Sequence, residues 1–179
     1  MDRLPFRATQ AALAYESIAR LPVTVLLENV RSMYNVGAFF RTCDAAGVDR
    51  LLLAGITAYP PKNGIRKTAL GSEESVRWEH APDALPLLER VKQEGHEIAA
   101  VETSAHAVDL FDWQPAFPVR LIFGHEVDGI SPEAAARCDA HIRIPMLGSK
   151  HSLNVATAGG VVIFELLRKY RMLGSAAHP

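Results

Sequence analysis

The sequence predicts an α/β domain in which a parallel sheet is covered by helices on both faces. Short, almost uniformly apolar runs recur along the chain, and stretches with helical spacing of apolar residues separate them. Strands that are buried on both faces carry such runs, because neither face meets water. Strands that alternate with helices typically build a parallel sheet. The predicted strands are Val23–Leu27, Leu51–Ala54, His96–Val101, Val119–Phe123 and His141–Ile144.

The predicted helices lie between these strands and at both ends of the chain. Asn35 is expected to cap the helix that stops before Gly47, and Pro22 ends the first helix. Residues 55–76 are rich in Pro and Gly, so they are expected to be mostly loop with a short helix at Ile65–Leu70. The other predicted helices are Thr9–Leu21, Asn35–Ala46, Asp83–Glu94, Pro132–Arg137 and Ser152–Leu173.

Length and composition predict a single core-forming domain. The chain has 179 residues, of which 49% are hydrophobic and 22% charged, and it shows no internal repeat. The expected organisation is a core at residues 23–172, an N-terminal helical extension at 1–22 and a tail at 174–179. No apolar run approaches the ~20 residues that a membrane helix needs, and no signal-peptide pattern is visible. A cytoplasmic protein without membrane attachment is therefore expected.

Cysteine usage and net charge narrow the function classes. Cys43 and Cys138 are too few to staple a fold and are expected in or near the core. His and Cys spacings match no zinc site, so no metal is expected. The net charge of −1 neither supports nor excludes RNA as a partner. Basic residues cluster locally at 66–67, 149–151 and 168–171, and each cluster taken alone is better explained as a solvated face.

Four loops follow predicted strands and are candidates for a small-molecule site. Ligands of open α/β sheets bind beyond the carboxyl ends of the strands. None of these loops carries the Gly-x-Gly-x-x-Gly dinucleotide pattern or a phosphate-binding P-loop. A triad of Ser152, His151 and Asp128 is disfavoured, because adjacent Ser and His side chains rarely face each other. The four loops are Glu28–Gly37, Glu102–His106, Gly124–Ile130 and Met146–Asn154.

Several polar residues in these loops and helices have both an ordinary and a functional interpretation. Asn35 and Asn154 could simply be helix caps, and Glu126 could be a solvent-exposed carboxylate. Arg41 lies in a mostly apolar helix, after Phe40 and before Cys43. It is therefore expected to be partly enclosed and to need an anionic or hydrogen-bonding partner.

Three motifs follow one another along the chain: Asn35-x-Gly37-x-x-x-Arg41, then Phe123-Gly124-x-Glu126-x-x-Gly129-Ile130, then Ile144-Pro145-Met146 with Ser152-Leu153-Asn154-Val155. Together they resemble the SpoU/TrmH family of RNA 2′-O-ribose methyltransferases in the SPOUT superfamily, over roughly residues 23–172. The resemblance implies a SPOUT-type fold with a deep C-terminal trefoil knot. It also implies a homodimer with the active site near the interface, and S-adenosylmethionine (AdoMet) as methyl donor, leaving S-adenosylhomocysteine.

The resemblance also implies roles for individual residues. Arg41 would activate the ribose 2′-hydroxyl as a base or clamp the neighbouring phosphate; the clamp is physically easier, because guanidinium does not deprotonate in proteins. Asn35 and Glu126 would hold Arg41 and the loops, while Ser152 and Asn154 would shape the pocket. The implied cofactor contacts are Glu102, Thr103, Gly124, Ile144, Met146 and Leu153. The candidate RNA contacts are Arg31, Arg66, Lys67, Lys150 and Arg168.

Three functions remain open at this point. An AdoMet-dependent RNA methyltransferase is preferred, with tRNA slightly favoured over rRNA because no extra RNA-binding domain is visible. A non-catalytic RNA-binding or assembly protein with the same fold is the second hypothesis, and absence of AdoMet binding would favour it. An unrelated small-molecule enzyme with an open sheet is the third. One departure from the family pattern is Ala156, where Ser is common.

Overall fold

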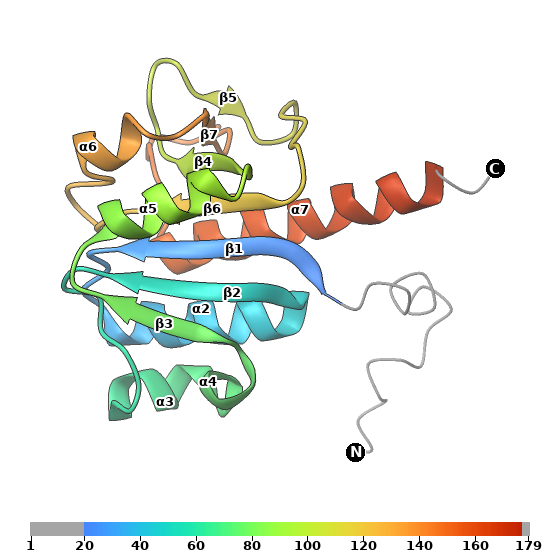
Figure 1. The fold of residues 1–179 in the computed structure, drawn as a ribbon. Helices are drawn as coiled ribbons and strands as arrows, with labels where there is room; N and C mark the ends of the chain where they lie inside the picture. Colours follow the sequence, from blue (N-terminus) through green and yellow to red (C-terminus); the bar gives the residue numbers. More distant parts are fainter. Residues whose placement is uncertain (1–19, 177–179) are drawn as a thin grey trace.

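A seven-stranded sheet, parallel at every pairing, organises residues 20–176, the part of the chain that this computed structural model describes (Figure 1). The strand order is β3-β2-β1-β6-β4-β7-β5. The strands are β1 (Leu21–Glu28), β2 (Val48–Ala54), β3 (Trp78–Ala81), β4 (Glu97–Val101), β5 (Val108–Asp109), β6 (Val119–Phe123) and β7 (Ala140–Arg143). The helices are α2 (Met33–Ala46), α3 (Asn63–Ala69), α4 (Ser72–Ser75), α5 (Ala84–Gln93), α6 (Pro132–Ala135) and α7 (Val155–Ala176).

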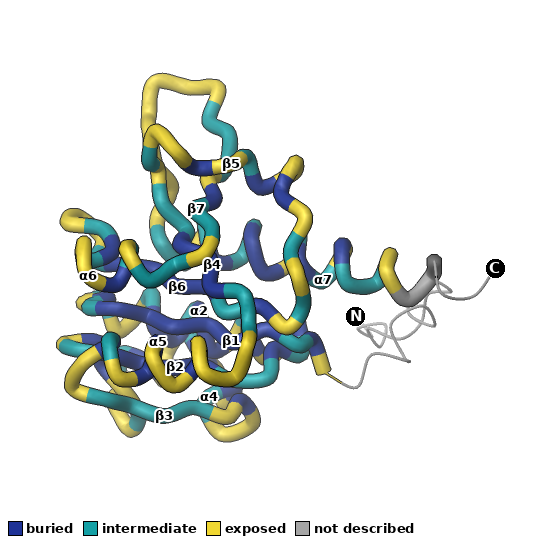
Figure 2. The backbone as a smooth tube through the Cα atoms, turned by 45° about the horizontal axis from the view of Figure 1, so that its top comes forward, coloured by how far each residue is buried: buried dark blue, intermediate teal, exposed yellow. Residues whose placement is uncertain are grey.

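Two hydrophobic layers, one on each face of the sheet, explain why the central strands are apolar throughout. Side chains of β1 alternate between the layers: Val25 and Leu27 lie in the layer beneath α2 and α7, whereas Leu26 lies in the layer beneath α5 and α6. Figure 2 shows the resulting pattern, with the central strands buried and the connecting loops exposed. The predicted sheet with helices on both faces is therefore confirmed.

Helices α2 and α7 pack against each other on one face, and a glycine permits their close approach. A Cβ atom placed on Gly159 of α7 would lie 2.3 Å from the phenyl ring of Phe39 in α2. The neighbouring Gly160 has nothing within 4 Å of such an atom. Beyond this contact α7 continues past the edge of the sheet (Figure 1), and Phe164, Met172 and Leu173 on it are exposed.

A buried lysine ties the far part of α7 to the segment that follows β5. Lys169 is 8% exposed, and its Nζ donates to the carbonyl oxygen of Leu110 at 2.7 Å and also to that of Trp113. Burial lowers the pKa of Lys169, which Glu165 at 3.7 Å partly offsets. The carbonyl groups of this segment are thus satisfied by a side chain from the other end of the domain.

Several element predictions need correction. Asn35 does not cap α2: Ser32 is the N-cap, and its hydroxyl accepts from the Asn35 backbone N–H at 3.3 Å. The predicted first helix lies outside the described residues except for its end, where Leu21 is wrong because it opens β1 and is fully buried. The two outer strands, β3 and β5, were not predicted. β3 is only half-buried and β5 is two residues long, so neither carries a continuous apolar run.

The remaining differences concern helix boundaries. Residues 55–76 contain α4 in addition to α3, which spans Asn63–Ala69 rather than Ile65–Leu70. Helix α7 begins at Val155, three residues later than expected, and runs to Ala176, so residues 174–176 belong to it rather than to a tail. Gly47 ends α2 as predicted, with φ 67° and its N–H bonded to the Asp44 carbonyl. The trefoil knot concerns the path of the loops rather than strand order, and it stays a prediction.

Candidate active site

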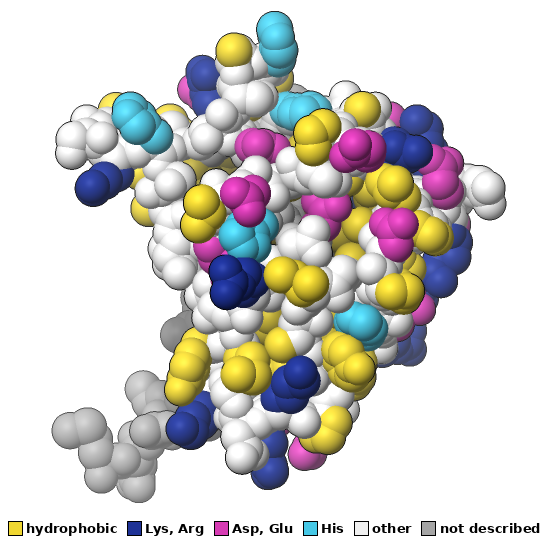
Figure 3. Space-filling view, turned by 90° about the vertical axis from the view of Figure 1, so that its left-hand side faces the viewer, with side chains coloured by type: hydrophobic (Ala, Val, Ile, Leu, Met, Phe, Trp, Pro, Cys, Tyr) yellow, Lys and Arg dark blue, Asp and Glu magenta, His cyan; other side chains and the backbone are white. Residues whose placement is uncertain are grey.

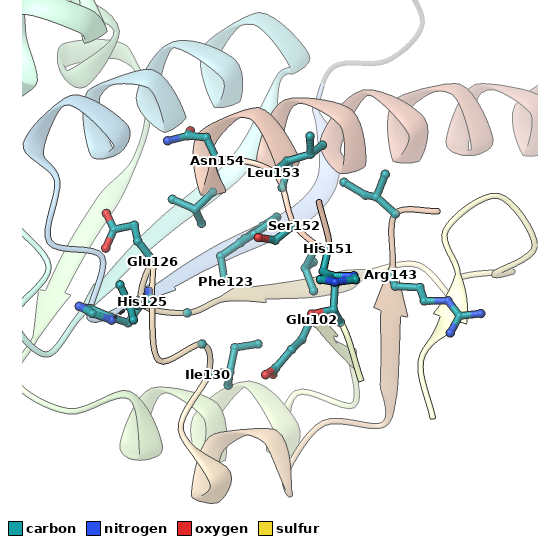
Figure 4. Close-up of a pocket in the computed structure, with 18 of the residues that line it drawn as sticks. Glu102, Phe123, His125, Glu126, Ile130, Arg143, His151, Ser152, Leu153 and Asn154 are labelled. Atoms are coloured by element: carbon teal, nitrogen blue, oxygen red, sulfur yellow. Dashed lines mark hydrogen bonds between the residues drawn. The ribbon is translucent and has the colours of Figure 1, made fainter. Parts of the chain in front are cut away.

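Three of the four loops predicted as ligand-binding line a cavity of about 470 Å³ at the carboxyl ends of the strands (Figure 4). This volume is in the range of small-molecule sites. The fourth loop, Glu28–Gly37, contributes no lining residue and meets the site through hydrogen bonds to Glu126. All six residues expected to contact a cofactor line it, as do Glu126, Ser152 and Asn154; the six are Glu102, Thr103, Gly124, Ile144, Met146 and Leu153. Apolar walls that were not among the predicted cofactor contacts come from Val101, Phe123, Ile130, Val155 and Ala158.

Glu126 is held by the start of α2, far away in sequence. Its two carboxylate oxygens accept from the backbone N–H groups of Arg31 and Ser32, each at 3.1 Å, and Oε1 also accepts from Asn35 Nδ2 at 3.0 Å. Partial burial by itself would raise the pKa of Glu126, but these hydrogen bonds outweigh it and the pKa is lowered. The carboxylate therefore occupies the positive end of a helix and stays ionised at neutral pH.

Asn35 connects Glu126 to the last helix. Its Oδ1 accepts from Asn154 Nδ2 at 3.2 Å, while its own amide nitrogen donates to Glu126. Asn154 Oδ1 in turn accepts from the backbone N–H groups of Ala156 and Thr157, at 3.0 and 3.3 Å, which is the ordinary capping role predicted for it. One continuous chain of hydrogen bonds, Glu126–Asn35–Asn154, thus links the starts of α2 and α7 at the cavity rim.

The loop after β6 folds back on itself at Gly124 and Gly129. His125 and Gly129 exchange both backbone hydrogen bonds, at 2.9 and 3.0 Å, and Gly129 has φ 74°. A Cβ on Gly124 would lie 2.2 Å from the carbonyl carbon of Gly129, so only glycine fits there. A Cβ on Gly129 would lie 2.9 Å from Glu102 Oε1, which places that carboxylate directly against the loop. The glycines of the second motif therefore shape the cavity wall.

Two charged neighbours of the cavity have partners of their own. Arg143 points away from Glu126 in Figure 4, and its Nε donates to Asp109 at 2.6 Å. His125 Nδ1 lies 3.0 Å from Asp128 Oδ2, so Asp128 pairs with His125 and not with His151. Ser152, His151 and Asp128 thus do not form a triad, in agreement with the prediction from their positions in the sequence.

Arg41 differs from what the sequence predicted. It lies on the outer side of α2, its side chain is exposed, and it does not line the cavity. Among residues 20–176 no hydrogen bond or ion pair engages it. The expectation that Arg41 is partly enclosed is wrong, and Asn35 and Glu126 bind each other instead of holding it. Helix periodicity could not separate these alternatives, because Arg41 stands six positions, more than one and a half turns, beyond Asn35.

The five candidate RNA contacts fall into two groups. Arg168 is engaged on its own helix, with Nε 2.8 Å from Glu165 Oε2, which lowers the pKa of Glu165. Arg66 stands 4.0 Å from Glu73. The other three, Arg31, Lys67 and Lys150, are exposed and have no carboxylate partner in the described part of the chain.

The carboxylates and apolar walls of the cavity fit a cofactor that carries an apolar ring, hydroxyl groups and a positive charge. The Glu102 carboxylate has no hydrogen-bonding partner within residues 20–176, so it can accept from a ligand. Glu102, Glu126 and Asp128 outnumber the one lining arginine, Arg143, which favours a cationic group. Apolar walls and backbone edges are suited to an adenine ring. AdoMet, with its sulfonium and ribose, has this chemistry.

A parallel sheet covered on both faces, with a ligand cavity at the carboxyl ends of its strands, defines an α/β protein that binds a nucleotide-like small molecule. The sequence profile of the SpoU rRNA methylase family matches residues 22–164. The chain therefore belongs to the SpoU methylase family, as its three motifs indicate.

The similar proteins are named for two substrate classes, tRNA and rRNA. The chain is 36% identical over 157 residues to the tRNA (guanosine(18)-2′-O)-methyltransferase of Thermus thermophilus, covering 88% of this chain and 80% of that one. It is 34% identical over 149 residues to the 23S rRNA (guanosine-2′-O-)-methyltransferase RlmB of Haemophilus ducreyi. That alignment covers 83% of this chain but only 60% of the relative.

Solved structures agree with the fold. The TrmH/SpoU tRNA modifying enzyme of Aquifex aeolicus superposes with a TM-score of 0.78 at 32% identity, covering 90% of this chain and 82% of that one. An AdoMet-bound rRNA methyltransferase of Sinorhizobium meliloti gives 0.75 at 31% identity, covering 82% and 56%.

Residues 20–176 contain neither a candidate membrane span nor a candidate metal cluster. No helix there has the length and apolarity to cross a membrane. No group of three or more His, Cys, Asp or Glu side chains there is arranged to hold a metal ion.

Proposed function

We propose that this protein is an AdoMet-dependent RNA methyltransferase that transfers a methyl group to a ribose 2′-hydroxyl. The observation that carries the proposal is that the second and third motifs line one cavity, while Asn35 of the first motif is hydrogen-bonded to Glu126 and Asn154 at its rim. Membership of the SpoU methylase family and the names of the relatives support the same reaction.

The cavity residues would hold the methyl donor, which supplies an activated methyl group on sulfur. Glu102 would accept hydrogen bonds from its hydroxyl or amino groups, and Ile144 and Leu153 would enclose its apolar ring. The hydrogen-bonded rim holds the starts of α2 and α7 at a fixed separation, so the cavity keeps its shape before substrate arrives. Such positioning of two reactants supplies a large part of the rate of a group transfer.

Arg41 is proposed to clamp the phosphate beside the target ribose. It can do so only together with a second protomer or with the bound RNA. The side chain is exposed and does not line the cavity of its own chain. The target ribose must therefore reach Arg41 in one of two ways: it is bound in the cavity of a second protomer, or the bound RNA extends from the cavity to Arg41. The exposed apolar residues of α7, Phe164 among them, support a homodimer, since free apolar faces of this kind are often interfaces.

Substitution of Arg41 tests the assignment. Arg41→Ala is expected to keep AdoMet affinity, measured by calorimetry, and to lose methyl transfer from radiolabelled AdoMet to RNA. Arg20→Ala, at another exposed arginine, serves as the control. Transfer at the wild-type rate would remove Arg41 from the mechanism, and absence of AdoMet binding by the wild type would favour a non-catalytic RNA-binding protein.

tRNA is the preferred substrate class. The chain spans 80% of the Thermus tRNA enzyme and 60% of the Haemophilus rRNA enzyme, so its similarity extends over more of the former. Nucleoside mass spectrometry of tRNA and rRNA from a strain without the gene should show one ribose methylation missing, in the tRNA fraction. A loss confined to rRNA would contradict the preference. The site of action is proposed to be the cytoplasm, where these RNAs are processed.

A further inference from the structure

The strongest unassigned feature is an exposed aromatic and basic surface on the loop that follows β2. It consists of Ile56, Tyr59 and Lys62, together with Arg31 on the neighbouring loop, and is called the β2-loop surface below. Ile56 is 65% exposed and Tyr59 41% exposed. Figure 3 looks onto the carboxyl ends of the strands, and hydrophobic side chains lie among Lys and Arg side chains in its lower half.

The β2-loop surface is fixed rigidly to the rim of the active-site cavity. Asn29 Oδ1 accepts from the Ile56 N–H at 3.1 Å, and Thr57 Oγ1 accepts from the Val30 N–H at 3.0 Å. The next residue, Arg31, donates its backbone N–H to Glu126. A short path of hydrogen bonds therefore joins the surface to the rim of the cavity.

Tyr59 is held in place by two neighbouring rings, and the ammonium group of Lys62 lies over its own ring. Its ring packs on His80 at a centroid distance of 4.1 Å and on Trp78 at 6.4 Å. Lys62 Nζ lies 5.6 Å from the centre of the Tyr59 ring. An anchored ring costs little entropy when a second ring stacks against it, and every nucleobase has a face that suits it.

The charges favour a polyanion over a protein partner. Neither Lys62 nor Arg31 has a carboxylate partner within residues 20–176. The carboxylate of Glu126, which accepts from the Arg31 backbone N–H, is occupied by three N–H donors. Cations beside an aromatic ring are the features by which proteins bind single-stranded nucleic acid.

We propose that the β2-loop surface binds RNA next to the target nucleotide, with a base stacked on Tyr59 and phosphates paired with Lys62 and Arg31. This inference rests on the proposed function, because it treats RNA as the substrate, and it extends that function to a specific docking surface. It adds residues that the sequence motifs do not contain.

The test measures RNA affinity separately from cofactor affinity. Fluorescence anisotropy with fluorescein-labelled bulk tRNA is expected to show a dissociation constant raised about 5- to 100-fold by Tyr59→Ala and much less by Tyr59→Phe, since the phenyl ring retains the stacking. Lys62→Ala is expected to reduce the slope of log affinity against log salt by about 0.7 to 0.9. AdoMet affinity should stay at the wild-type value in all three variants, which also shows that they fold.

Matched controls come from other exposed side chains of the same types. Phe111, which is 55% exposed, provides an aromatic residue outside the surface, and Lys92 provides an exposed lysine on α5. Phe111→Ala and Lys92→Ala are expected to leave RNA affinity unchanged. Equal losses in the control variants would overturn the assignment of the surface.

The remaining outcomes separate this inference from the proposed function. Unchanged RNA affinity in Tyr59→Ala and Lys62→Ala, with methylation intact in the wild type, overturns the docking surface alone. A change of oligomeric state in light scattering without a change in RNA affinity shows a surface for a second copy and also overturns it. RNA binding that depends on Tyr59 in a wild-type protein without transferase activity supports the surface and contradicts the proposed reaction.

Discussion

Replacement of Gly124 by alanine tests how much the loop that forms one wall of the cavity contributes to AdoMet affinity and to stability. The added methyl would lie 2.2 Å from the carbonyl carbon of Gly129 and 2.3 Å from the Ile130 nitrogen. Ordinary contact begins at 3.4 Å, so the two sides of the loop must separate by about 1 Å. Gly124 does not have a left-handed backbone, so the effect is steric only. Overpacking of this kind costs about 1–3 kcal/mol.

That cost has two measurable consequences. If the loop moves, the AdoMet dissociation constant rises by about 5- to 150-fold, which is 1–3 kcal/mol converted to affinity. If it does not move, the free energy of unfolding falls by a similar amount. Calorimetric titration and denaturant unfolding measure the two quantities. Gly148→Ala is the control, because Gly148 lies between the cavity-lining Met146 and His151 with nothing within 4 Å of the added methyl. Wild-type affinity together with wild-type stability in Gly124→Ala would refute the reasoning.

Three further predictions follow from the packing, the pKa values and the exposed arginine. In denaturant unfolding, Gly159→Ala should lower the free energy of unfolding by about 1–3 kcal/mol, because the added methyl overlaps the Phe39 ring. Gly160→Ala should raise it by about 0.5–1 kcal/mol, because alanine favours the helix. Equal effects of the two substitutions would contradict the contact between α2 and α7. Glu126→Gln should lower the free energy of unfolding by about 0.5–1 kcal/mol at pH 7, where the wild-type carboxylate is ionised and its hydrogen bonds are partly exposed to solvent. Because the folded-state pKa of Glu126 lies below 4.5, that difference should persist at pH 4.5 and shrink as the pH falls through the folded pKa, whereas a constant difference would contradict its role. In an assay at an AdoMet concentration far below the dissociation constant of Gly124→Ala, random co-assembly of Arg41→Ala and Gly124→Ala chains should restore about one quarter of wild-type transfer if Arg41 serves the partner's cavity in a dimer. It should restore no more than the residual transfer of Gly124→Ala if Arg41 serves its own cavity.

Much of the fold was predictable because its signals are local. Apolar runs such as 119–123 identify strands buried on both faces, and Gly47 ends a helix where a left-handed residue is needed. The failures were also local in origin. The half-buried strand β3 has no apolar run, and Ser32 competes with Asn35 as cap, with only their three-residue spacing to distinguish them.

The site followed a different rule. The motif residues predicted to bind the cofactor do line one cavity, because each follows a strand and the carboxyl ends of parallel strands share one edge of the sheet. Their partners were not predictable. Glu126 takes hydrogen bonds from residues more than 90 positions away, and Asn154 reaches Asn35 across 119 positions. No local pattern reports that the Asn35 amide faces the Asn154 amide.

The sequence by itself determined the alternation of the central strands and helices, the loops that carry the ligand site and the family to which the chain belongs. These follow from hydrophobic periodicity, from glycine positions and from three short motifs. The tertiary structure alone decided that Arg41 faces outward, that Glu126 receives hydrogen bonds from the start of α2, and that Tyr59 packs on His80. The rotation of a helix about its axis and the contact of distant loops depend on how helices pack on the sheet, which only the folded chain specifies.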